Sequence, residues 1–239
     1  LTAKATLETS SRLDNKGERL SLAHDRELDL IAERLKETQV DACGISLIHA
    51  HLDPDFEKNI AEQLSRRGVE NIIRATELSK SHGLGARTET LAVEASLHGI
   101  MKSFVDELLP TTMNHRNISV MTSSGGLTGE GAFKAKDGLL SGPAGGVVGA
   151  SLAATRCDEP RILGFDMGGT STDVSRWDRR MLYRFETKVG PARIQSPCLA
   201  IETVAAGGGS ICSFGSEGLK VGPESAGAEP GPAAYNKGG

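Results

Sequence analysis

The sequence contains few aromatic residues and no long apolar run, and these shortages exclude some classes of protein. Phenylalanine, tyrosine and tryptophan make up 4% of its 239 residues. No apolar run approaches the roughly 20 residues that a membrane-spanning helix needs. The formal net charge of −4 offers no excess of basic residues for nucleic acid or acidic lipid headgroups. We therefore expect no nucleic-acid partner and no membrane partner.

Cysteine is also scarce, and its spacing excludes a disulfide framework. The four cysteines are scattered without a C-x-x-C pair: Cys43, Cys157, Cys198 and Cys212. A chain of this length can bury a hydrophobic core without disulfide bonds. The spacing therefore predicts reduced thiols and a cytoplasmic location. Nothing in their surroundings supports a cysteine nucleophile.

Glycine is abundant, and regular elements alternate before the glycine-rich part begins. The 29 glycines concentrate after residue 125, which indicates many tight turns. Asp53 as N-cap, Pro54 at the first helical position and Gly68 after the end delimit one helix. The expected elements are a hairpin over 5–22, helices over 25–38, 54–67 and 86–109, and strands over 42–50 and 69–78. This alternation favours parallel strands joined by crossover helices, with a boundary near residue 80.

The segment "FDMGGTSTD" is the most informative stretch. An apolar strand carries Asp166 to its end, and a second carboxylate, Asp173, follows seven residues later. Between them lie backbone amides and hydroxyls that can converge on one point, those of Gly168, Gly169, Thr170, Ser171 and Thr172. Such a cluster of donors is typical of a phosphate-binding turn. The alternative is a plain hairpin whose Asp and Thr side chains bond their own backbone.

Two carboxylates beside a phosphate would repel it unless a cation lay between them. We therefore expect Asp166 and Asp173 to hold a divalent cation, Mg²⁺ with its waters. Alternatively, one of these two acids orients a water molecule or accepts a proton, which would make it a catalytic residue.

A second glycine-rich segment, "LLSGPAGGVVGAS" over 139–151, predicts a helix. We expect Ser141 to cap a helix that begins at Pro143. The free amides at a helix N-terminus and its partial positive charge favour a phosphate. The candidate cofactor-binding residues here are Ser141, Gly142, Gly145 and Gly146. The alternative is tight packing of the helix on a sheet, which the small residues also permit.

Two further segments carry weaker signals. In "VAAGGGSI", residues 204–211, Gly207, Gly208 and Gly209 could let a nucleotide base or ribose lie against the backbone, or could form only a flexible turn. In "HAHLDPD", residues 49–55, His49, His51 and Asp53 alternate, so on a strand they would share a face as metal ligands do. The expected N-cap role of Asp53 competes with that interpretation.

The segments "SGPAGGVVGA", "GFDMGGTSTDVS", "TVAAGGGSI" and "VGPESAGAEPGPAAY" together resemble the hydantoinase A / 5-oxoprolinase family. The resemblance implies an α/β chain with an actin-like (ribonuclease H-like) ATPase fold, here incomplete, with mixed sheets flanked by helices. Residues 1–80 would be the tail of the family's N-terminal region. Residues 81–239 would be the first part of the hydantoinase A domain, with its phosphate-binding hairpin at Asp166 to Asp173.

The same resemblance implies ATP-dependent chemistry. ATP with Mg²⁺ or Mn²⁺ would phosphorylate the carbonyl oxygen of a cyclic amide, 5-oxoproline or hydantoin, before the ring is hydrolysed, and a hydantoinase B-type region or subunit would be the partner. The alternatives are a subunit of an acetone- or acetophenone-type carboxylase and a non-catalytic nucleotide-binding scaffold. The family's first D-x-G-G-T-x-T-D turn has no counterpart before residue 160. We therefore expect a fragment with about half of an ATP site, inactive alone.

Overall fold

The computed structural model describes residues 3–108 and 118–239 and divides into two compact units. Unit 1 comprises Leu1–Val120, Thr128–Leu139 and Phe185–Pro197, and unit 2 comprises Met121–Leu127, Leu140–Arg184 and Cys198–Gly239. These compact units are not separated at residue 80, because the helix that follows that position packs within unit 1. The boundary near residue 80, and the two family regions expected on either side of it, stay predictions.

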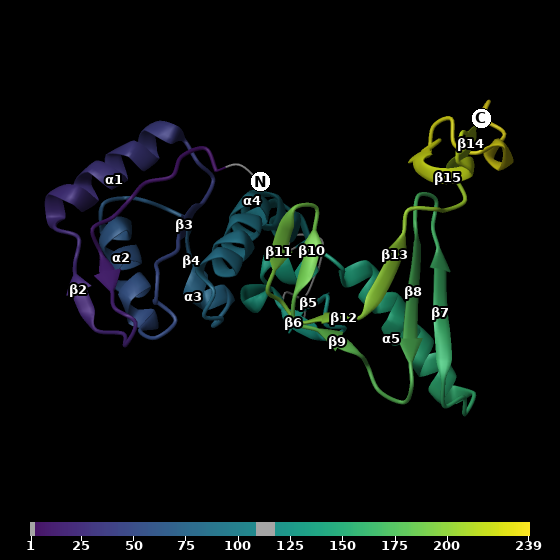
Figure 1. Ribbon diagram of the computed structural model, residues 1–239, viewed down its shortest axis with the longest axis horizontal. Helices are drawn as coiled ribbons and strands as arrows, with labels where there is room; N and C mark the ends of the chain where they lie inside the picture. Colours follow the sequence, from purple (N-terminus) through teal and green to yellow (C-terminus); the bar gives the residue numbers. More distant parts are fainter. Residues whose placement is uncertain (1–2, 109–117) are drawn as a thin grey trace. The chain divides into compact units, whose positions relative to one another are not determined.

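The N-terminal part of unit 1 is a β-α-β arrangement with one more helix (Figure 1). Helix α2 (Pro54–Arg66) connects β3 (Cys43–Ile45) to β4 (Ile72–Arg74), and these two strands pair in parallel. Helix α1 (Asp25–Thr38) has the bounds that its apolar stripe predicted. Buried side chains of the two helices, of β3 and of the segment between α2 and β4 form one core: Leu28, Ala32, Cys43, Ile45, Ile60, Leu64 and Val69. The predicted parallel crossover is confirmed here.

The predicted N-terminal hairpin is also present, although its strands are short. Strands β1 (Arg12–Leu13) and β2 (Arg19–Ser21) pair in antiparallel fashion. The turn between them is closed by Asp14, whose Oδ1 accepts hydrogen bonds from the amides of Lys16 and Glu18 at 2.8 Å each. Gly17 has φ of +86°, a conformation that few residues other than glycine adopt without strain.

The predicted strand over 69–78 is wrong in its second half. Strand β4 ends at Arg74, and a short helix, α3 (Ala75–Leu78), follows at once. The strand ends there because of a contact with a residue that is distant in the sequence. The buried Glu57 carboxylate accepts hydrogen bonds from the amide and hydroxyl of Thr76, at 2.9 and 2.8 Å, and holds that residue in the helical turn.

Helix α2 starts where it was predicted to start, but the Asp53 side chain does not cap it as expected. Asp53 is the N-cap residue and Pro54 opens the helix, as expected. The Asp53 side chain makes no capping hydrogen bond, however, and instead forms an ion pair with Arg19 at 2.8 Å. Gly68, with φ of +81°, follows the end of the helix as predicted.

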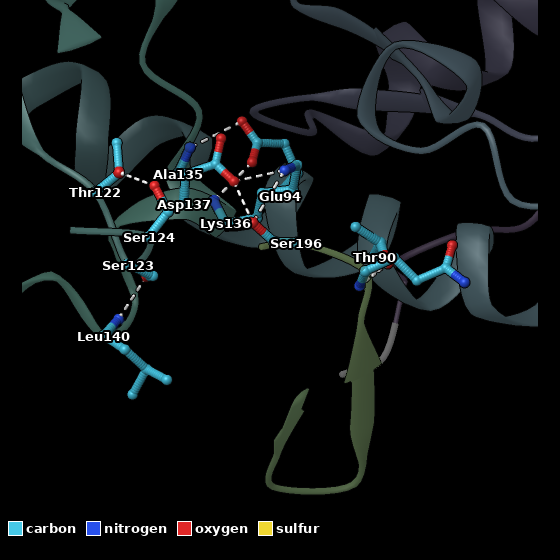
Figure 2. Close-up of polar contacts among 11 residues, drawn as sticks. Thr90, Glu94, Thr122, Ser123, Ser124, Ala135, Lys136, Asp137, Leu140 and Ser196 are labelled. Atoms are coloured by element: carbon cyan, nitrogen blue, oxygen red, sulfur yellow. Dashed lines mark hydrogen bonds and ion pairs between the residues drawn. The ribbon is translucent and has the colours of Figure 1, made fainter. Parts of the chain in front are cut away.

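The rest of unit 1 packs around the long helix α4 (Leu84–Leu108). Position 109, the last of the predicted helix, lies outside the described residues. Helix α4 packs against the antiparallel pair of β10 (Thr187–Val189) and β11 (Ala192–Ile194), with Val93, Ala192 and Ile194 buried between them. Figure 2 shows the buried Glu94 carboxylate of α4 accepting the amides of Ala135 and Lys136, at 3.0 and 2.8 Å, where the 3₁₀ helix η3 (Ala135–Gly138) begins.

Unit 2 is built on a three-stranded antiparallel sheet in the order β13-β8-β7. Its strands are β7 (Ile162–Met167), β8 (Thr172–Trp177) and β13 (Ile201–Val204). Helix α5 (Ser141–Arg156) packs against β7 and β8 (Figure 1). The core between helix and sheet includes Ala144, Val147, Leu199 and Ile201. This packing fixes the helix beside the strand ends that carry the two acids.

The remaining elements are short. They are β5 (Ser119–Met121), β6 (Leu127–Gly129), η2 (Glu130–Ala132), β9 (Tyr183–Arg184), β12 (Cys198–Leu199), β14 (Ser210–Gly215), β15 (Gly218–Ser225) and η4 (Ala233–Tyr235). Strands β9 and β12 pair in antiparallel fashion, as do β14 and β15. Across residues 3–108 and 118–239, no helix is both long and apolar enough to cross a membrane.

Candidate functional site

The segment around Asp166 and Asp173 forms the tip of the β7–β8 hairpin. The antiparallel register places Asp166 directly opposite Asp173, and Met167 opposite Thr172. A turn over residues 168–171 connects the strands and is closed by a hydrogen bond from the Gly168 amide to the Ser171 carbonyl at 2.9 Å. The predicted strand–turn–strand unit is therefore present.

Both acids line one cavity of about 200 Å³ beside α5. Because strand side chains alternate between the two faces of a sheet, directly paired residues share a face. The lining residues are Pro143, Gly146, Val147, Ala150, Gly164, Phe165, Asp166, Asp173, Ser175 and Ile201. Like charges placed directly opposite in an antiparallel pair are destabilising. The arrangement is therefore suited to a bound cation.

The two carboxylates differ in their surroundings. Asp173 Oδ1 accepts a hydrogen bond from the Thr203 hydroxyl at 2.6 Å. Asp166 has no side-chain hydrogen bond within the described part of the chain, and its Oδ2 lies 3.6 Å from the position that a Cβ on Gly146 would occupy. Two carboxylates with open coordination positions match the way proteins usually hold Mg²⁺, through one or two carboxylates plus phosphate oxygens and waters.

The turn between the acids offers free donors. Within the residues that the structure describes, the amides of Gly169, Thr170 and Ser171 have no hydrogen-bond acceptor. Thr172 differs from the prediction, because its buried hydroxyl donates to the Ala206 carbonyl at 2.6 Å and has no proton left for a phosphate. The donor set that the structure brings together is thus three amides and two hydroxyls.

The glycines at 207–209 dock the following loop onto this turn. The amides of Gly208 and Gly209 donate to the carbonyls of Gly168 and Gly169, at 2.9 and 2.7 Å, and the Gly207 amide donates to Ser210 Oγ at 2.8 Å. A Cβ on Gly207 would lie 2.6 Å from the Gly168 carbonyl oxygen, closer than atoms can approach. All three amides are therefore bonded within the protein, and contact of these glycines with a base or ribose stays a prediction.

Helix α5 begins earlier than expected, and Ser141 is not its cap. The helix starts at Ser141, the N-cap position is Leu140, and no side chain caps it. The Leu140 amide instead donates to Ser123 Oγ at 2.9 Å (Figure 2), and the Ser123 carbonyl accepts the Leu199 amide at 2.8 Å. Ser123 was missed as a positioning residue; its only sequence signal is the strand-to-glycine turn "MTSSGGL".

The glycines of α5 lie largely outside its packing face. Among the described residues, a Cβ on Gly142, Gly145 or Gly149 would meet no atom within 4 Å beyond the adjoining backbone of the helix, whereas Ala144 and Val147 make the buried contact with the sheet. Packing therefore does not require those three glycines. They leave open space along the helix, while Gly146 faces Asp166.

The segment "HAHLDPD" does not gather its candidate metal ligands at one point. The rings of His49 and His51 are 6.3 Å apart, and Asp53 is paired with Arg19. Partial burial and the nearby charge of Arg87 lower the pKa of His51. Among the described residues, no group of three or more His, Cys, Asp or Glu side chains is arranged to hold a metal ion.

The cysteines form no disulfide, and burial makes two of them poor nucleophiles. All four are unpaired, as the spacing predicted. Burial raises the pKa of the Cys43 and Cys198 thiols, which disfavours the nucleophilic thiolate.

Comparisons with known proteins identify related chains. A family model described as Hydantoinase/oxoprolinase matches residues 87–239, and one described as the Hydantoinase/oxoprolinase N-terminal region matches residues 1–68. The chain is 40% identical to 5-oxoprolinase PfmaA of Pestalotiopsis fici over 212 residues, covering 86% of this chain and 16% of that protein.

Two solved structures share the fold. The ATP-dependent caprolactamase from Pseudomonas jessenii superposes with a TM-score of 0.80 at 26% identity, over 96% of this chain and 34% of that one. A nucleotide-free acetone carboxylase gives a TM-score of 0.75 at 22% identity, over 95% and 34%. These likenesses confirm the predicted fold class, an α/β chain with an actin-like ATPase fold whose small sheets are flanked by helices. The sheets are not mixed as predicted, because each sheet in the described part of the chain is either parallel or antiparallel.

Proposed function

Because the chain belongs to the hydantoinase/oxoprolinase family, we propose that its full-length protein is an ATP-dependent hydrolase of cyclic amides. The favoured substrate is 5-oxoproline, since the 40% identity to a 5-oxoprolinase exceeds the 26% to a caprolactamase and the 22% to an acetone carboxylase. The structural observation that carries the proposal is the cross-strand pair of Asp166 and Asp173 beside free turn amides.

ATP phosphates would lie on the turn between the two acids. The amides of Gly169, Thr170 and Ser171 are available as donors, and the side-chain hydroxyls of the last two add to them. The N-terminus of α5, around Ser141 and Gly142, would contribute about 0.3–1 kcal/mol through its partial positive charge. Water exclusion around these donors would strengthen each contact.

Asp166 and Asp173 would hold the cation, Mg²⁺ or Mn²⁺. When bound, such a cation neutralises negative charge on the phosphates during phosphoryl transfer. The placement of two like charges directly opposite each other in the sheet is the feature that supports this assignment. His49 is not part of the proposed site.

Asp166 is the better candidate for a role with water or a proton. Its carboxylate has no hydrogen-bond partner in the described part of the chain, whereas Asp173 is held by Thr203. A carboxylate that is not held by the protein can orient a water molecule or accept a proton once the amide carbonyl is activated.

The remainder of the full-length protein, or a separate subunit of the hydantoinase B type, would supply the partner surface. The unpaired cysteines support a cytoplasmic location.

The proposal is tested by ATP hydrolysis of the full-length protein in the presence of candidate substrates. We expect 5-oxoproline to stimulate hydrolysis and to be opened to glutamate, with caprolactam and with acetone plus bicarbonate as comparisons. Stimulation only by acetone with bicarbonate would favour the carboxylase alternative. Hydrolysis unchanged by every cyclic amide and ketone would favour a nucleotide-binding scaffold.

A further inference from the structure

Thr203 extends the pair of acids into a row across all three strands of the sheet. In the antiparallel register, Asp173 of β8 is paired with Asp166 of β7 on one side and with Thr203 of β13 on the other. The three side chains therefore share the face that borders the cavity. The Thr203 hydroxyl donates to Asp173 Oδ1 at 2.6 Å.

Because of this contact, the carboxylate of Asp173 is held by a hydrogen bond, whereas that of Asp166 has none from the residues that the structure describes. A hydrogen bond to an ionised carboxylate is roughly twice as strong as one between neutral groups, and it limits rotation of the carboxylate. The bond occupies Oδ1 of Asp173 and leaves its Oδ2 without a hydrogen-bond partner among the described residues. Asp166 has no corresponding donor there.

We propose that Thr203 is a positioning residue that orients Asp173 as the cation ligand. The inference rests on the proposed function, since it assumes that the two acids hold Mg²⁺ or Mn²⁺. Residues that hydrogen-bond a metal ligand fix its direction in advance, and their loss typically lowers metal affinity about 10- to 100-fold. Thr203 is exposed and lies on a strand, so replacing its hydroxyl with a methyl group leaves the packing of the sheet unchanged.

The test measures Mn²⁺ affinity directly, in the full-length protein with a non-hydrolysable ATP analogue. Free Mn²⁺ is followed by electron paramagnetic resonance during titration. We expect Thr203→Val to weaken Mn²⁺ binding roughly 10-fold and Thr203→Ser, which keeps the hydroxyl, to restore most of the affinity. Thr187→Val is the matched control, since it makes the same change on strand β10, where the Thr187 hydroxyl bonds no carboxylate of the described residues. This variant should bind Mn²⁺ as the parent does.

A double-substitution cycle separates the two claims. Asp173→Asn should weaken Mn²⁺ binding by itself, and Thr203→Val should add little further loss in that background. If Asp173→Asn weakens binding and Thr203→Val does not, the positioning role is wrong while the cation site stands. If neither Asp166→Asn nor Asp173→Asn changes Mn²⁺ affinity, both the cation site and the role of Thr203 are overturned.

Discussion

Asp166 and Asp173 face each other as a direct cross-strand pair, so the fold places two negative charges side by side without a basic partner between them. A favourable cross-strand pair contributes roughly 0.2–1 kcal/mol, and like charges directly opposite each other are destabilising. The pair of acids therefore lowers the stability of the fold when the cation is absent. When the cation is present, the same two carboxylates can bind it.

Asp166→Asn should raise the stability of the protein and lower its activity. Without a divalent cation, the free energy of unfolding should rise by up to about 1 kcal/mol, because the repulsion is removed. Substrate-dependent ATP hydrolysis by the full-length protein should fall on the order of 100-fold or more, because a group that acts on a proton or water contributes at least that much. Urea denaturation and a coupled ATPase assay measure the two quantities. A variant that is less stable and still active would refute the role given to Asp166.

Gly207→Ala should disturb the turn beneath the proposed phosphates. The new Cβ would lie 2.6 Å from the Gly168 carbonyl oxygen, so one of the two backbone segments must move. Overpacking of this kind typically costs about 1–3 kcal/mol. Gly208→Ala is the control, since its nearest atom would lie at an ordinary 3.8 Å. Equal unfolding free energies for the two variants, measured by urea denaturation, would show that the loop is not docked on the turn.

Glu57→Gln should destabilise the N-terminal core of unit 1. The buried carboxylate accepts the Leu47 amide at 3.0 Å and both donors of Thr76. A glutamine offers only one acceptor oxygen and turns its NH₂ group toward a donor, so a loss of about 1–3 kcal/mol is expected from urea denaturation. Glu62→Gln, on the exposed side of the same helix, should leave stability nearly unchanged. Similar losses for both would mean that Glu57 does not hold α3.

Glu89 should confer stability that depends on pH. The hydrogen bonds from the Arg193 side chain and amide lower the pKa of Glu89 from 4.5 to about 2. Since the folded pKa lies below the unfolded one, this stabilisation is complete above about pH 4.5 and is lost as the pH falls toward 2. Arg193→Gln should return the pKa of Glu89 toward 4.5 and flatten that part of the stability profile. Side-chain titration by nuclear magnetic resonance measures the pKa, and an unchanged value would contradict the pairing.

Features set by neighbouring residues could be predicted from the sequence. The stripe of α1, the Asp53–Pro54 start of α2 and the glycine turn of β1–β2 each depend on residues a few positions apart. The β7–β8 hairpin belongs to the same group, because its apolar strand, its glycine turn and its second strand follow one another directly in the sequence. The pairing of Asp166 with Asp173 is set by the register across that turn.

Features set by distant residues could not be predicted in this way. The turn into α3 depends on Glu57, 19 residues from Thr76. The start of α5 depends on Ser123, 17 residues from Leu140. The inward hydroxyl of Thr172 depends on a loop 34 residues away. In each case the local sequence was compatible with several hydrogen-bond partners. The partner that is used depends on how distant segments pack together in the fold.

In the proposed site, the turn amides bind the phosphates of ATP and the two acids bind them through a cation. A crystal structure of the full-length protein with Mg²⁺ and a non-hydrolysable ATP analogue tests this arrangement most directly. We expect a phosphate oxygen within about 3 Å of the Gly169 or Thr170 amide, with Mg²⁺ between that phosphate and the carboxylates of Asp166 and Asp173. A nucleotide bound elsewhere, with the turn amides contacting only water, would contradict it.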